Sequence, residues 1–161
     1  MSARIRKAMD DKEQGFTLIE LLVVMIIIGI LAAIAIPTFL NQRKNGWNSA
    51  SKTDAANLAL AVESAAVDKG GDFTKVFVTK TKDTALSTGG VAQGSIAGVE
   101  FAGTQNVDLV LGKDVTSSDF CIVAHNSNID ATDGWWTYAK SKGGLLPTVA
   151  ASKADAETAC G

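Results

Sequence analysis

The sequence contains 22 consecutive residues without a charged side chain, from Leu21 to Gln42. Most of this run belongs to a longer apolar segment that begins at Phe16, includes Glu20 and extends to Leu40. A helix of about 25 residues is about 38 Å long, which is enough to cross a hydrocarbon core of about 30 Å. A helix that is apolar on all sides must lie in lipid or among similar helices. Residues 16–40 are therefore predicted to form a transmembrane or filament-core helix.

The segments on either side of this run differ in character. Residues 1–15 are charged, and the basic side chains come first, which favours a cytoplasmic location for this end. Beyond residue 40 the apolar residues recur at steps of three and four, which predicts an amphipathic continuation of the helix, with Asp54 as an exception in the apolar stripe. Lys69-Gly70-Gly71 is a typical helix end. One helix is therefore expected from about residue 16 to 69.

The rest of the chain, residues 72–161, is rich in β-branched and aromatic residues separated by Gly, Asn and Asp. Strands are predicted over 73–80, 107–112, 119–125 and 135–140, with the last three forming an antiparallel meander. Residues 81–106 are interpreted as a loop with one short strand over 95–101, and residues 152–159 as a short helix. The expected fold class is α+β, with a long amino-terminal helix packed on an antiparallel sheet of about four strands.

Two ordinary explanations of the amino-terminal segment leave features unexplained. Ala33-Ile34-Ala35 resembles the cleavage site of a secretory signal, and a plain membrane anchor would account for the length of the run. Neither explains Glu20, because a carboxylate at membrane depth costs about 2.5–3.5 kcal/mol on insertion scales. Neither explains Gly15-Phe16 at the start of the run.

Residues 15–21, GFTLIEL, closely resemble the processing site of type IV pilins, and the resemblance is strong over residues 15–42. In that family a dedicated membrane peptidase cuts after the glycine and methylates the new amino terminus. The resemblance implies cleavage between Gly15 and Phe16, which would leave N-methyl-Phe16. Glu20 matches the family's glutamate four positions after that terminus.

The same resemblance gives the domain organisation and two further positions. It implies a leader peptide over 1–15, a transmembrane and filament-core helix over 16–40, and a globular pilin domain over 41–161. Gly29 and Pro37 match positions that weaken the helix in the family. Intrinsic helix propensities agree with this, since relative to alanine a proline destabilises a helix by about 3 kcal/mol and a glycine by about 1 kcal/mol.

Physical chemistry gives Glu20 a role in assembly. It lies about one helical turn from the expected new amino group, so the two charges can pair in a medium of low dielectric constant. Pairing between neighbouring subunits would offset the desolvation of both groups and fix the axial register. Each subunit would then offer the same helix to the next one, and such a contact grows into a helical filament.

Cys121 and Cys160 are the two cysteines of the chain. An export signal places the globular part outside the cytoplasmic membrane, where disulfides persist. In the chain-entropy model, closing a loop near 40 residues stabilises the folded state by about 4 kcal/mol. We therefore expect a disulfide between them, rather than two reduced thiols. Many type IV pilins are similar in having such a carboxy-terminal loop.

The globular part holds few other candidates for chemistry. Asp130–Asp133 alternate oxygen ligands as some calcium loops do, although a polar hairpin loop is the simpler interpretation. Trp136 and Tyr138 should share one face of a strand and Trp135 the other, which favours core packing over a sugar-binding platform. His125 has no recognisable nucleophile near it. One histidine and two cysteines exclude a zinc site with several such ligands, and no cofactor or enzyme activity is indicated.

The resemblance implies a major pilin of a type IV pilus that self-associates into a helical filament. Prepilin peptidase and a membrane assembly machinery are its expected partners. The precursor would be a single-pass protein of the cytoplasmic membrane, and the product a cell-surface pilus. The alternatives are a pseudopilin of a type II secretion system, which a calcium site would favour, and a minor or competence pilin. A net charge of −2 does not suggest a nucleic-acid surface, and the sequence leaves such binding open.

Overall fold

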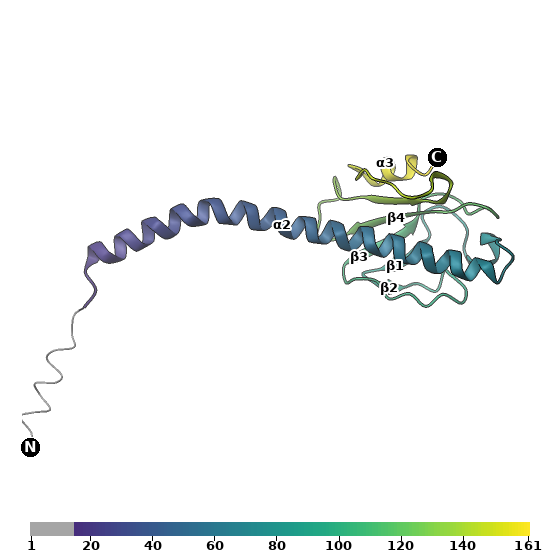
Figure 1. The fold of residues 1–161 in the computed structure, drawn as a ribbon, viewed down its shortest axis with the longest axis horizontal. Coiled ribbons are helices and arrows are strands. Elements are labelled where there is room, and N and C mark those ends of the chain that lie inside the picture. The colour runs from purple at the N-terminus through teal and green to yellow at the C-terminus, as the bar shows by residue number, and fades with distance from the viewer. Residues whose placement is uncertain (1–14) are drawn as a thin grey trace, which may run out of the picture. The chain divides into compact units, whose positions relative to one another are not determined.

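The computed structural model describes residues 15–161 of the chain. The predicted leader therefore lies outside the described residues, apart from Gly15. The chain divides into two compact units, and the second begins at Arg43 and ends at Gly161. Figure 1 shows the helices and strands that form them.

The predicted long helix is confirmed as α2, which runs from Leu18 to Val67. It ends as expected, because Gly70 and Gly71 have positive φ angles of 71° and 80°, and Gly71 N–H donates to the carbonyl of Ala66 at 2.8 Å. The amino-terminal part of α2 exposes its large apolar side chains. Within residues 15–161, α2 is the one helix that is long and apolar enough to cross a membrane.

The sheet has six antiparallel strands rather than the predicted four, in the order β2-β1-β3-β4-β5-β6. The strands are β1 (Ala85–Thr88), β2 (Val91–Ala92), β3 (Val107–Leu111), β4 (Cys121–Asn126), β5 (Trp136–Ala139) and β6 (Gly144–Leu145). The meander β3-β4-β5 confirms three of the predicted strands. The remaining elements are the 3-10 helices η1 (Phe73–Lys75) and η2 (Lys140–Lys142) and the helix α3 (Lys153–Thr158), which confirms the predicted terminal helix.

Two strand predictions, over 73–80 and 95–101, are wrong. The first segment begins as the 3-10 helix η1, which Asp72 caps by accepting a hydrogen bond from Thr74 N–H at 3.0 Å. The two segments meet only at an isolated bridge between Phe77 and Ile96. Phe73, Val76 and Phe77 are all buried, and their spacing of three and four residues suits a helical turn better than an alternating strand. Strands β1 and β2 formed instead in the region interpreted as a loop.

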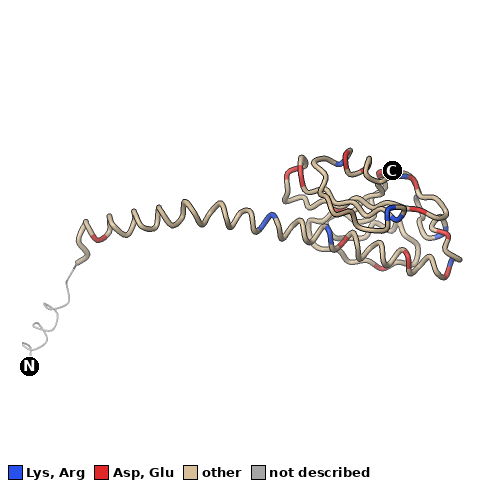
Figure 2. The backbone as a smooth tube through the Cα atoms, turned by 45° about the horizontal axis from the view of Figure 1, so that its top comes forward, with Lys and Arg blue, Asp and Glu red and all other residues tan. Residues whose placement is uncertain are grey.

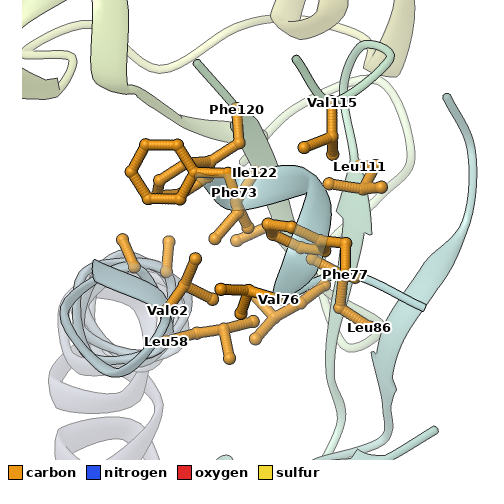
Figure 3. Packing of buried hydrophobic residues seen from close by; sticks show 14 of the residues in the cluster. Leu58, Val62, Phe73, Val76, Phe77, Leu86, Leu111, Val115, Phe120 and Ile122 are labelled. Atoms are coloured by element: carbon orange, nitrogen blue, oxygen red, sulfur yellow. The ribbon is translucent and has the colours of Figure 1, made fainter. Parts of the chain in front are cut away.

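The main core lies between the second half of α2 and one face of the sheet. Helix residues Ala55, Leu58, Ala59, Val62 and Ala66 pack there against apolar side chains of β1, β3 and β4 and against the segment around η1. Figure 3 shows how Leu58 and Val62 of the helix face Phe73, Val76 and Ile122, with Phe120 beside them. This packing explains why α2 is amphipathic in its second half.

A smaller cluster covers the opposite face of the sheet, where the carboxy-terminal segment and α3 lie (Figure 1). Cys121 and Val123 of β4 pack there against Ala156 and Cys160. The predicted disulfide is present, and it joins Cys121 to Cys160 across a sequence separation of 39. Since both faces of β4 are covered, all six of its residues are buried.

Asp54 breaks the apolar stripe of α2 for a structural reason. Its side chain is only 5% exposed, and its carboxylate accepts hydrogen bonds from the backbone N–H of Thr104 at 2.6 Å and from the Thr104 hydroxyl at 3.1 Å. A buried carboxylate needs such partners, because an unpaired one would pay the full cost of desolvation. Asp54 thus fixes the loop before β3 to the helix.

We predict that Asp54→Ala lowers the free energy of unfolding by about 1–3 kcal/mol, because it leaves a backbone N–H without its acceptor. Denaturant unfolding of the detergent-solubilised chain measures the change. Asp68→Ala removes the same charge from an exposed position and should change stability by less than about 0.5 kcal/mol. Equal stability of both variants would contradict the structural role of Asp54.

We also predict that replacing Cys121 and Cys160 together by alanine lowers the free energy of unfolding by about 4 kcal/mol, the loop-entropy value for this separation. Removing both thiols avoids a lone cysteine that could form dimers. The wild-type protein, fully reduced as judged by its mass, should unfold with the same midpoint as the variant. A midpoint that is unaffected by reduction would show that the bond does not stabilise the domain.

Candidate functional site

The start of α2 is organised around Thr17 and Glu20. The carboxylate Oε2 of Glu20 accepts hydrogen bonds from the backbone N–H of Thr17 at 2.9 Å and from the Thr17 hydroxyl at 2.8 Å. In return, the Thr17 oxygen accepts from the backbone N–H of Glu20 at 3.3 Å. This reciprocal arrangement is a capping box, which satisfies backbone donors that a helix start leaves unpaired.

The peptide bond between Gly15 and Phe16 lies just before this cap. Both residues are outside the helix and exposed, with Phe16 87% accessible. Irregular, exposed backbone is what proteases cut most readily. The capping box therefore leaves the dipeptide outside the helix while the helix itself begins at Leu18.

Gly29 and Pro37 both lie within the uninterrupted helix α2. Proline has no backbone N–H, so the carbonyl of Ala33 loses its usual donor at this point. The next residue, Thr38, donates its hydroxyl to the carbonyl of Ile34 at 2.6 Å. A Cβ added at Gly29 would meet no atom within 4 Å, so the fold of the single chain does not require glycine there. A helix-weakening role for the two residues stays a prediction.

The charges at the two ends of the apolar run define what this segment can do. Glu20 is followed by no charged side chain until Arg43, and Figure 2 shows the stretch as a tan tube. An acidic group at the edge of such a helix favours a cationic partner, because a charge in an apolar medium is costly when it is unpaired. Binding of a positive group by Glu20 stays a prediction.

The Asp130–Asp133 loop uses its carboxylates internally. Asp130 accepts hydrogen bonds from the backbone N–H and the hydroxyl of Thr132, at 2.9 and 2.7 Å, and these bonds lower its pKa. Asp133 accepts from Gly134 N–H at 2.7 Å and pairs with Lys44 of α2, which lowers its pKa as well. In the described part of the chain, no group of three or more His, Cys, Asp or Glu side chains could hold a metal ion.

His125 and Trp135 form a stacked pair on the face of the sheet that α3 covers. Their ring centroids are 4.3 Å apart, and the Trp135 indole N–H donates to the carbonyl of Ala131 at 2.8 Å. His125 Nε2 lies 3.4 Å from the carbonyl of Asp130. The pair is therefore part of the hairpin packing between β4 and β5.

Trp136 and Tyr138 share the opposite face and contact α2, as the alternation along β5 predicts. The Trp136 indole N–H donates to Asn48 Oδ1 at 3.1 Å, and the Tyr138 hydroxyl donates to Glu63 Oε1 at 2.8 Å. Burial, followed by the hydrogen bond to Glu63, raises the pKa of Tyr138 from 10.0 to about 12. The two aromatic residues thus join sheet and helix.

Sequence reasoning did not identify the polar partners of these contacts. Lys44, Asn48 and Glu63 lie on α2, more than 70 positions away in sequence from the residues that they bind. In the sequence these residues indicate only the polar face of an amphipathic helix, and nothing there identifies their partners. Gly112 was also missed, although a Cβ there would overlap with Cys160 Sγ in the disulfide.

Comparisons with known proteins agree with the amino-terminal motif. The family described as the prokaryotic N-terminal methylation motif matches residues 10–36. The type IV major fimbrial protein FimA of Dichelobacter nodosus is 38% identical over 82 residues, which are 51% of each chain. The type IV major pilin protein PilA of Myxococcus xanthus is 47% identical over 55 residues, 34% of this chain and 25% of PilA.

One further relative belongs to a secretion system. The type II secretion system core protein G of Escherichia coli is 38% identical over 55 residues, which are 34% of this chain and 35% of the relative. The chain spans about half or less of the length of the curated relatives it matches. No solved structure matches it. These comparisons confirm the resemblance to type IV pilins that the amino-terminal motif indicated.

Tyr138 is the single tyrosine of the chain, so its titration can be followed directly by tyrosinate absorbance. We predict a midpoint near pH 12, lowered in Glu63→Gln but still above 10 because burial remains. A folded-state pKa above the unfolded value gives stability that is complete below pH 10 and is lost as the pH rises towards 12. An ordinary midpoint near 10 in the native protein would contradict both the burial of Tyr138 and its contact with Glu63.

Proposed function

We propose that this chain, a type IV pilin-like protein, is the major structural subunit of a type IV pilus. The observation that carries the proposal is Glu20, the first-turn acid of a helix that is otherwise uncharged up to Gln42. In a plain membrane anchor this carboxylate would do no more than cap its own helix through Thr17. When a subunit leaves the membrane to join a bundle of identical helices, the carboxylate gains a positively charged partner on a neighbouring subunit. This pairing would fix the position of the subunit.

The first proposed step is removal of the leader by a prepilin peptidase between Gly15 and Phe16, followed by methylation of Phe16. The exposed, non-helical backbone of these residues supports access by a protease. The precursor would be held in the cytoplasmic membrane by the amino-terminal part of α2, with its amino terminus inside. The membrane-embedded assembly machinery would then receive the mature subunit.

The second step is pairing between subunits. In the single chain, both hydrogen bonds from Thr17 fall on Oε2 of Glu20, and no bond to Oε1 is present within residues 15–161. The carboxylate can therefore cap its own helix while its second oxygen accepts from the Phe16 amino group of a neighbouring subunit. Such charge-assisted bonds in an apolar surrounding are stronger than those between neutral groups.

The third step is repetition of the same contact. Because each subunit offers Glu20 at one place and its amino group at another, the contact is heterologous and extends into a helical filament. The large apolar side chains that α2 exposes before Arg43 would be covered by equivalent helices of other subunits.

A pseudopilin of a type II secretion system is the second candidate, favoured by the similarity to core protein G. The disulfide supports a pilin. A calcium site at Asp130–Asp133 would favour a pseudopilin, but these carboxylates bind Thr132 and Lys44 of the chain itself, which also supports a pilin. A minor or competence pilin would share the same amino-terminal segment. Electron microscopy of filaments sheared from cells tests the choice, since long surface filaments built of this chain are expected only for a major pilin.

We predict that the mature protein begins with N-methyl-Phe16. Gly15→Val should leave an uncut precursor in the membrane, because the residue before the cut must be small. Mass spectrometry of the amino terminus measures both results. A mature chain that begins after the Ala33-Ile34-Ala35 segment would instead support a secretory signal.

We predict that Glu20→Ala is processed and inserted but does not form filaments when it is the only subunit. Its insertion should be favoured by up to about 3 kcal/mol. Assembly should lose about 3–5 kcal/mol at each interface, because the buried amino group of a neighbour has no partner. Membrane level, mature mass and sheared-filament yield are measured together.

Two matched variants separate charge pairing from helix capping. Glu20→Gln keeps an acceptor that suits a capping box but has no charge, and Thr17→Val keeps the charge but loses the capping hydroxyl. Charge pairing predicts that Glu20→Gln fails to assemble and that Thr17→Val assembles. Normal filaments from Glu20→Gln would refute the charge-pairing mechanism.

A further inference from the structure

We propose that the carboxy-terminal segment over residues 152–161 is a latch that gates access to the disulfide between Cys121 and Cys160. The bond would exchange with a small thiol, or with a thiol–disulfide oxidoreductase, only while this latch is open. Four charged side chains would set how often it opens under native conditions: Lys82, Asp83, Lys153 and Glu157. All of these residues lie in the globular unit, so the latch does not depend on filament assembly.

The disulfide is closed off from solvent in the folded unit. Cys121 is 0% and Cys160 1% exposed, and both belong to the cluster that includes Ala156 of α3. The carbonyl oxygen of Ala156 lies 3.7 Å from Cys160 Sγ, so this helix lies directly against the bond. Exchange requires a thiolate to reach one of the two sulfur atoms. The bond can therefore react only when part of the fold opens.

Helix α3 covers the bond with little apolar support of its own. It has six residues, and Ala156 is the buried one among them. A helix this short is not stable by itself, and burial of one methyl group contributes little. Its other fixed points are polar, since Ser152 caps its start and the Thr137 hydroxyl donates to the carbonyl of Ala156 at 3.1 Å. Polar and charged contacts therefore decide whether α3 stays closed.

The charged contact of α3 centres on Glu157, whose side chain is only 11% exposed. Its Oε2 pairs with Lys82 Nζ at 2.7 Å, and its Oε1 lies 3.4 Å from Lys153 Nζ. That Oε1 atom is buried and has no hydrogen-bond partner among the described residues, so it depends on the charge of Lys153. Lys153 also pairs with Asp83. Hydrogen bonds to Glu157 and Asp83 raise the pKa values of Lys82 and Lys153 respectively, so both lysines are charged at neutral pH.

Lys82 belongs to the fixed side of this contact, and Glu157 to the moving side. Lys82 precedes β1, and its backbone N–H donates to Asp114 Oδ1 at 2.7 Å. Lifting α3 returns Glu157 to water, whereas in the closed form two lysines offset the desolvation of its carboxylate. Without Lys82, the closed form would hold a largely buried carboxylate with one cation beside it. Loss of this lysine therefore favours the open latch.

The experiment measures how fast the disulfide is reduced in the detergent-solubilised full-length chain. Dithiothreitol in mildly alkaline buffer starts the reaction, an excess of N-ethylmaleimide stops it, and mass spectrometry gives the fraction of chains with two labelled cysteines. A series of urea concentrations below the unfolding transition separates two routes. Opening of α3 exposes little surface, so the rate should depend only weakly on urea, whereas global unfolding would give the full equilibrium slope.

Matched variants make the test specific to the charges of the latch. Lys82→Gln should speed reduction about 3–10-fold, as expected for the loss of one partly buried ion pair. Asp83→Asn should have a smaller effect, because Asp83 is 55% exposed, and asparagine tolerates the positive φ of 66° at this position. Lys75→Gln removes the same charge from a pair with Asp72 at η1, which packs on the α2 side of the sheet, and should leave the rate unchanged.

A double variant tests whether Lys82 acts through Glu157. Lys82→Gln and Glu157→Gln remove the same ion pair, so together they should speed reduction no more than the larger single effect. Additive effects would refute this pairing. Equal rates for the unmodified chain and Lys82→Gln would overturn the latch. A urea dependence as steep as that of global unfolding, in the unmodified chain or in Lys82→Gln, would also overturn it, because the bond would then be reached only from the unfolded state.

Discussion

The carboxylate of Glu20 is the one charge in an apolar helical segment, and burial of an unpaired charge in an apolar medium is costly. In the single chain the carboxylate satisfies the start of its own helix through Thr17. Under the proposed function, its second oxygen would accept a hydrogen bond from the amino terminus of another subunit. A cap and an assembly contact can thus share one side chain, since a carboxylate accepts several hydrogen bonds.

The second half of the helix obeys a different constraint. From Ser51 onward, one face of α2 is buried, and from Ala55 its apolar residues pack against the sheet. Polar residues on and beside this face bind specific partners. Asp54 binds Thr104, and Glu63 binds Tyr138. These contacts fix the helix to the sheet at several points along its length. The disulfide and α3 cover the other face of β4, so the central strand is enclosed on both sides.

Arg43 begins the globular unit and is the first charge beyond the apolar run. Arg43 stacks on Trp47 at this boundary, and the adjacent Lys44 contacts the Asp130–Asp133 loop. The side chains of α2 therefore change from uncharged to charged at Arg43, although the helix is continuous there.

The sequence by itself determined the features that depend on local pattern. Continuous hydrophobicity and the Gly-Gly stop predicted α2. β-Branched and aromatic residues between turn residues predicted β3, β4 and β5, and two cysteines in an exported domain predicted the disulfide. The motif around Gly15, Phe16 and Glu20 was equally visible, because its residues are close together in the chain.

Only the tertiary structure decided the features that depend on distant partners. Strands β1 and β2 are short and rich in small residues, and they pair because β3 offers an edge, which no local pattern reveals. The segment 73–80 begins as the 3-10 helix η1, because its buried apolar residues are three and four positions apart and pack against α2. The burial of Asp54 likewise needed Thr104, 50 positions away, since a buried charge is stable only where the fold supplies its hydrogen bonds.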